Sequence, residues 1–152
     1  MAAFRGNHPA KIDDKGRLKL PAAFKALMDA EGVSQFYVTS SDGASAEIWP
    51  LPEWEKREEK LAEASEMDDS VKKYMKWTSY YGQQVEMDSQ ARIVLPMILR
   101  NDAKLDAEVT IFGMRMYLDV QNREVVEKEL QEQKLTAEDR RTMAALLRQQ
   151  GS

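Results

Sequence analysis

Apolar and basic residues alternate strictly in one short stretch near the start of the chain, Arg17 to Leu20. In a β-strand this alternation places Leu18 and Leu20 on the buried face and the two basic residues on the opposite face. The stretch belongs to a ten-residue segment, IDDKGRLKLP at 12–21, whose pattern returns as MDSQARIVLP at 87–96. We interpret a chain that repeats itself near its midpoint as two copies of one unit.

Both halves predict the same order of elements: strand, turn, strand, short helix, two strands and long helices. A proline after each alternating strand ends the ladder and suits the first turn of a helix. In the first half we expect strands at 4–11, 17–20, 35–40 and 47–50 and helices at 22–28, 53–66 and from about 71. In the second half we expect strands at 85–87, 92–95, 109–112 and 116–120, a turn at Gly113, and helices at 97–103, 122–134 and from 136. The sequence therefore predicts an α+β fold made of two repeats, residues 1–82 and 83–152.

Composition narrows the class of protein. A hydrophobic content of 43% is enough for a core, and no apolar run approaches the roughly 18 residues that a membrane helix needs. The absence of cysteine excludes disulfides and thiolate zinc sites. The first ten residues lack the apolar segment of a secretory signal. We expect a soluble, intracellular protein.

The charge of the chain is unevenly distributed. The net charge of −4 by itself argues against a nucleic-acid partner. The first 25 residues, however, contain six Lys or Arg and only two acidic residues, whereas the remainder contains 16 basic and 24 acidic residues. A polyanion responds to the local field of a basic patch rather than to the overall charge. Charge alone leaves open whether this basic segment is a binding surface or a solvated end.

Each copy of the repeat carries the pattern Asp-x-x-x-Arg across a turn, Asp13 with Arg17 and Asp88 with Arg92. A tight turn brings its two ends together, so each carboxylate can pair with its guanidinium and hold the shape of the turn. Arginine suits this role because its planar fork can bond a carboxylate on one edge and keep other N–H groups free. The pair can therefore be a structural staple, an oriented ligand contact, or both.

The two copies differ in charge. The first has Lys15, Gly16 and Lys19 where the second has Gln90, Ala91 and Val94. If the motif contacts an anion, the first copy is the stronger contact. The second copy then mainly completes the fold.

Four segments together give the chain a specific resemblance: Phe4-Arg5-Gly6, IDDKGRLKLP, LPEWEK at 51–56, and MDSQARIVLP. Over essentially its whole length the chain resembles the MraZ family of bacterial transcriptional regulators. The resemblance implies two tandem AbrB-like (swapped-hairpin) modules that form one pseudo-symmetric β-barrel with flanking helices. It also implies a homo-oligomeric ring, an octamer or larger, that binds short G-rich direct repeats in promoter DNA of division and cell-wall genes.

The resemblance implies roles for particular residues as well. By position, Lys15 and Arg17 face the DNA, and Arg5 supports them. In the second copy, Arg92 occupies the position that matches Arg17. Asp13 and Asp88 are the acidic anchors of the two copies. We expect Arg17 to contact the edges of the bases, and Lys15 and Arg5 to contact the phosphate backbone of the DNA. The expected partners are double-stranded DNA and further copies of the chain, without membrane, metal or cofactor. The expected location is the cytoplasm, in association with the nucleoid.

Two other functions compete with this one. A ring-forming protein-interaction module without direct DNA binding is suggested by the acidic helices and by the aromatic cluster Trp77, Tyr80 and Tyr81. At helical spacing such aromatic residues belong more often to a core or subunit interface than to a surface that stacks on bases. An enzyme is disfavoured because His8 is the only histidine, no glycine-rich phosphate loop occurs, and each repeated Asp has an Arg neighbour.

Overall fold

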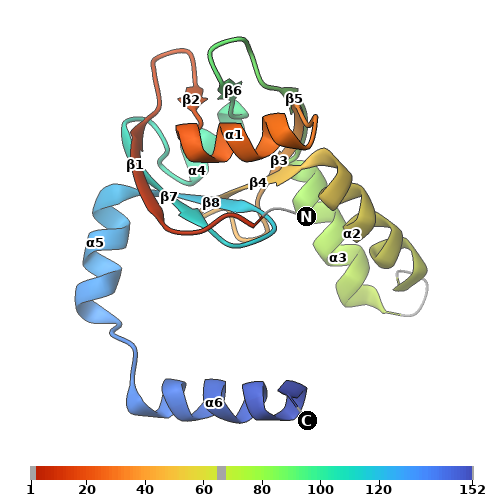
Figure 1. Ribbon diagram of the computed structural model, residues 1–152, viewed down its shortest axis with the longest axis vertical. Coiled ribbons are helices and arrows are strands. Elements are labelled where there is room, and N and C mark those ends of the chain that lie inside the picture. The colour runs from red at the N-terminus through yellow and green to blue at the C-terminus, as the bar shows by residue number, and fades with distance from the viewer. Residues whose placement is uncertain (1–2, 65–67, 152) are drawn as a thin grey trace.

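A computed structural model describes residues 3–64 and 68–151 (Figure 1). Its first half contains β1 (Asn7–Lys11), β2 (Arg17–Lys19), α1 (Ala22–Ala30), β3 (Gln35–Thr39), β4 (Ala46–Pro50), α2 (Leu51–Ala64) and α3 (Asp69–Tyr80). Its second half contains β5 (Gln83–Glu86), β6 (Arg92–Val94), α4 (Met97–Asp102), β7 (Glu108–Gly113), β8 (Leu118–Asn122), α5 (Arg123–Glu132) and α6 (Ala137–Gly151). The predicted α+β class and the order of elements are confirmed. Residues 65–66, the predicted end of a helix, lie outside the described residues.

Strands from the two halves interleave in a six-stranded antiparallel sheet with the order β1-β7-β8-β4-β3-β5. The first strand of each half pairs with the other half, since β1 lies against β7 and β5 lies against β3. The hairpins β3–β4 and β7–β8 meet through β4 and β8 at the centre of the sheet. The first strand of each half is therefore hydrogen-bonded to a strand of the other half.

The sheet is open. β1 and β5 are its two edges, each paired on one side only within this sheet. The expected β-barrel is therefore not confirmed. The repeat predicts which strands resemble each other, but closure of a sheet also requires a definite tilt and stagger of the strands, which the repeat leaves unspecified.

β2 and β6 form a separate two-stranded antiparallel sheet with Leu18 opposite Ile93. Both side chains point inward and are essentially fully buried. Leu20 and Leu95, which follow the two strands, join the same core. The period-two pattern predicted this division of faces correctly, because three alternating residues are enough to define the inner side of a strand.

Aromatic rings hold the first long helix on the sheet. Trp54 of α2 stacks on Tyr37 at 4.7 Å between ring centroids and meets Trp49 edge-on at 5.5 Å, and Trp49 stacks in turn on Tyr117 at 4.6 Å. The guanidinium of Arg57 lies over the ring of Trp49. In Figure 1, α2 and α3 lie side by side, whereas α6 stands apart from both sheets. Within the described residues, no helix combines the length and apolar character needed to cross a membrane.

The prediction of a turn at Gly113 is wrong. Gly113 is the last residue of β7, and the turn to β8 follows it, with Arg115 at φ 67°. A side chain at Gly113 would meet backbone atoms of Arg5 and Phe4 at 2.3–2.6 Å. Position 113 needs a glycine because the N-terminal segment packs closely against it. From the sequence alone, a glycine kept for close packing cannot be told from a glycine kept for a turn.

Replacing Gly113 by Ala should lower the free energy of unfolding by roughly 1–3 kcal/mol, because the atoms that would clash are backbone atoms, which have little freedom to move. Urea unfolding followed by circular dichroism measures the change. Gly151→Ala is the matched control, since a methyl group there meets nothing within 4 Å. Equal stability of the two variants would contradict the packing argument.

Candidate nucleic-acid interface

The turn between β1 and β2 is held by the carboxylate of Asp13. Its Oδ1 accepts hydrogen bonds from the backbone N–H groups of Lys15 and Arg17 at 3.0 and 2.8 Å. Its Oδ2 accepts a bond from Nε of Arg17 at 2.7 Å. The backbone of Gly16 donates to the carbonyl of Asp13 with φ 79°, the left-handed conformation that glycine adopts without steric cost.

The turn between β5 and β6 repeats this geometry. Asp88 accepts from the backbone N–H groups of Gln90 and Arg92 and from Nε of Arg92, each bond at 2.9 Å. Ala91 occupies the left-handed position with φ 62°. A non-glycine residue there costs about 1–2 kcal/mol, so the second turn keeps its shape at some expense. The predicted Asp–Arg staple is confirmed in both copies.

Arg17 remains available for a ligand. Asp13 takes the Nε edge of its guanidinium, and no other described residue forms an ion pair with Arg17. The two terminal nitrogens thus keep the planar donor geometry that matches a bidentate acceptor. The staple and the ligand contact are compatible because they use different edges of one group.

Pairing of β2 with β6 brings basic residues from both copies onto one face. Lys19 lies opposite Arg92, and Arg17 lies opposite Val94, while the residues between them point into the core. Figure 1 shows the loops that precede the two strands projecting in the same direction, at the top of the view. We call the outer side of β2 and β6, together with the exposed Lys15, the basic face. The second copy therefore adds Arg92 to the same surface rather than forming a separate one.

Arg100 of α4 is a further basic residue at this site that the sequence analysis missed. Its Nε donates to the carbonyl of Leu95 at 3.0 Å. Its guanidinium carbon would lie 2.4 Å from a Cβ placed on Gly16, so the side chain lies directly against the first turn. No ion pair to Arg100 occurs among the described residues. Only tertiary structure reveals this contact, because it joins the helix of one half to the turn of the other.

Arg5 lies elsewhere. It precedes β1, next to the bridge between Phe4 and Arg115, whereas the Asp13 turn follows the other end of that strand. The whole of β1 therefore lies between Arg5 and the turn that begins at Asp13. The structure thus does not bring Arg5 together with Lys15 and Arg17 in one chain. Its role in DNA contact stays a prediction.

Comparison with known proteins identifies the family. The model of the MraZ protein family matches residues 3–74 and 82–146. The chain belongs to the MraZ family. A protein named transcriptional regulator MraZ from Acidobacterium capsulatum is 50% identical over 141 residues, which cover 93% of this chain and 97% of the relative. A protein of the same name from Koribacter versatilis is 44% identical over 94% of this chain and 98% of the relative. Another from Thiobacillus denitrificans is 32% identical over 78% of this chain and 80% of the relative. The resemblance inferred from the repeated motifs is therefore confirmed.

His8, the only histidine, does not belong to the basic face of this MraZ-family chain. It lies in β1, where its ring meets Phe24 edge-on at 4.6 Å. Among the described residues, no group of three or more His, Cys, Asp or Glu side chains could hold a metal ion. The basic face is built from Arg and Lys side chains, and the carboxylates of Asp13 and Asp88 orient two of them.

Both acidic anchors are more acidic than an ordinary aspartate. The backbone N–H of Arg17 has the largest influence and lowers the pKa of Asp13, and the Arg17 side chain adds to the effect. The corresponding bond from Arg92 lowers the pKa of Asp88. A lowered pKa in the folded state means that each carboxylate stabilises its turn above the unfolded-state pKa.

NMR titration of the side-chain carboxyl carbons should give midpoints for Asp13 and Asp88 below the usual value of about 3.9. The stabilisation should be complete at neutral pH and be lost as the pH falls below about 4 and through the lower folded pKa. In the Arg17→Ala variant the midpoint of Asp13 should rise only part of the way, because the backbone donors remain. A midpoint for wild-type Asp13 at or above the usual value would contradict the described hydrogen bonds.

Proposed function

We propose that this chain is a sequence-specific DNA-binding transcriptional regulator of division and cell-wall genes. It binds short G-rich direct repeats in double-stranded promoter DNA as a homo-oligomeric ring of eight or more copies, in the cytoplasm at the nucleoid. The observation that carries the proposal is the basic face, where Arg17, Lys19 and Arg92 lie on one surface beside Lys15 and Arg100. The names of the relatives, transcriptional regulators rather than enzymes, support it.

Each half acts as one module, residues 1–82 and 83–152. The exchange of β1 and β5 between the halves supports a swapped-hairpin, AbrB-like origin for the two modules. The first module supplies the charge, and the second supplies Arg92 and the α4 helix that supports the first turn. The two copies therefore have different roles on one shared surface.

Arg17 is the residue proposed to read the bases. Its free terminal nitrogens can donate together to O6 and N7 of guanine, which fits a G-rich target. Lys15 at the tip of the turn, Lys19 and Arg100 carry single charges suited to phosphate. Arg92 keeps the same free edge as Arg17 and extends the surface along the groove.

Assembly accounts for tight binding by an acidic chain. One basic face offers only a few charges. A ring repeats that face, so several copies can bind successive repeats, and linked binding raises the overall affinity by orders of magnitude without new contacts. Direct repeats with a regular spacing are the kind of target that such an array matches.

Arg17→Ala should weaken binding to the cognate repeats by roughly five- to 150-fold, since a bidentate contact to guanine is worth about 1–3 kcal/mol. A gel-shift titration measures the affinity, and solution mass checks that assembly is intact. Lys128→Ala is the matched control, because it removes an exposed charge from α5, away from the basic face. Unchanged affinity of the Arg17 variant would contradict the assignment. Arg5→Ala in the same assay decides whether Arg5 supports binding.

Binding should weaken steeply as salt rises, with a slope of log affinity against log salt of about −0.9 for each phosphate contacted. Lys15→Ala and Arg100→Ala should each make this slope shallower, whereas the substitution at Lys128 should leave it unchanged. A flat salt response, or no binding at low salt, would instead favour a protein-interaction module without direct DNA contact.

A further inference from the structure

Helix α6 leaves an apolar surface without a partner. None of its residues is buried, and Met143, Leu146 and Leu147 are each more than half exposed. The N-terminus of the helix is nevertheless capped, because Thr136 and Asp139 form two reciprocal hydrogen bonds between side chain and backbone. An amphipathic helix normally buries its apolar side, whereas the apolar side chains of this 15-residue helix remain open to a partner.

The internal repeat makes the exposure of α6 specific. Its counterpart in the first half is α3, which is attached to its own module. Thr39 donates its hydroxyl to the carbonyl of Thr78 at 2.6 Å, and Arg57 of α2 donates to the hydroxyl of Tyr74 at 3.1 Å. In contrast, α6 buries none of its residues. In Figure 1, α6 lies apart from the sheets and runs across the bottom of the view, below α5.

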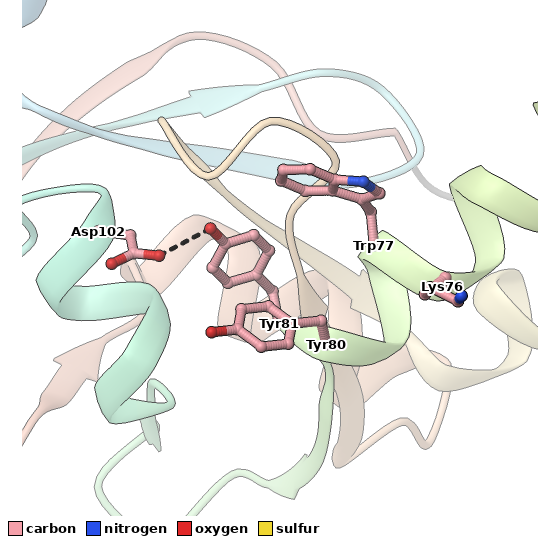
Figure 2. A pocket seen from close by; sticks show the side chains of 5 residues that line it. All are labelled: Lys76, Trp77, Tyr80, Tyr81 and Asp102. Carbon is pink, nitrogen blue, oxygen red and sulfur yellow. Dashed lines mark hydrogen bonds between the residues drawn. The ribbon is translucent and has the colours of Figure 1, made fainter.

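A second unpartnered surface lies at the C-terminal end of α3, facing α4. A pocket of about 410 Å³ is lined there by Lys76, Trp77, Tyr80, Tyr81 and Asp102. Figure 2 shows the rings grouped opposite Asp102, which accepts a hydrogen bond from the Tyr81 hydroxyl at 2.7 Å. Tyr81 is buried, but Trp77 and Tyr80 remain 42% and 61% exposed. The pocket is therefore preformed and offers large apolar rings to a partner.

We propose that α6 of one copy docks in the Trp77–Tyr80 pocket of the next copy in the ring. This rests on the homo-oligomer of the proposed function and names the contact that builds it. The two surfaces match in character: Met143 and Leu147 share a helical stripe with Arg140. The pocket combines its rings with the carboxylate of Asp102 on α4 and with Lys76 on α3. Apolar side chains of α6 cover the rings, and Arg140 lies towards Asp102.

The geometry of this contact suits a ring. The docking helix and the pocket are different surfaces of the same chain, so the interface is heterologous, with each copy giving α6 to one neighbour and receiving α6 from the other. Head-to-tail contacts of this kind generate closed rings or open filaments, whereas a contact between two identical patches would stop at a dimer. The aromatic cluster thus serves assembly, and the basic face stays free.

Disulfide trapping tests the contact in the full chain. The chain contains no cysteine, so Tyr80→Cys combined with Leu147→Cys introduces the only two thiols. Under oxidising conditions this double variant should give a ladder of covalent multimers on a non-reducing gel. Lys60→Cys with Leu147→Cys is the matched control and should give none, because Lys60 is exposed on α2 outside the pocket. Met97→Cys with Leu147→Cys tests another exposed apolar residue.

Solution mass provides the second measurement. Leu146→Ser with Leu147→Ser should lower the oligomer mass towards that of the 17.4 kDa chain while the circular dichroism of the fold is retained, since both side chains are exposed. A wild-type protein that is itself monomeric would overturn the ring and this contact together. An intact wild-type oligomer with no Tyr80–Leu147 cross-link, with a cross-link within one chain, or with a cross-link at Met97 instead would overturn this contact alone. An oligomer mass that the serine substitutions leave unchanged would also overturn this contact.

Discussion

The pairing of β2 with β6 is the contact on which the rest of the molecule depends. Each strand has only three residues, but the ladder continues through reciprocal backbone bonds, from Leu20 to the carbonyl of Ala91 at 2.8 Å and from Leu95 to the carbonyl of Gly16 at 2.9 Å. Each repeat thereby fastens its strand to the turn of the other. The same pairing buries Leu18 and Ile93 and presents Arg17, Lys19 and Arg92 outward. The core and the basic face are thus two sides of one small sheet.

The two repeats share a backbone but have diverged in what they do. Both turns keep the Asp–Arg staple, and ion pairs this accessible to solvent add little to stability. Their value therefore lies in orientation more than in stability, since the carboxylate holds an arginine by one edge and leaves the other edge free. The first copy adds Lys15, Lys19 and a strain-free Gly16. The second accepts left-handed strain at Ala91 and contributes the α4 helix, whose Arg100 lies against the first turn.

Divergence also extends to the helices. In the first half, Trp54 and Trp49 join α2 to the sheet through a series of ring contacts, two stacked and one edge-on, that ends at Tyr117. In the second half, α5 buries only Val126 and α6 buries nothing. One helical pair thus packs against the sheet, and the other stays largely exposed. The structural asymmetry parallels the asymmetry of charge between the two turns.

Local chemistry along the chain was enough to predict the elements, the inner face of β2 and β6, and both Asp–Arg turns. Each depends on residues close in sequence: an alternating period, a proline after a strand, a carboxylate four residues before an arginine. The sequence also carried the family motifs and the basic turn. Long-range pairing decided the rest. It made the sheet open rather than a barrel, showed that Gly113 packs against the backbone of Arg5, separated Arg5 from the basic face, and brought Arg100 under Gly16. These contacts join residues far apart in the chain, and no local period or spacing encodes which distant backbone or side chain will lie against a given residue.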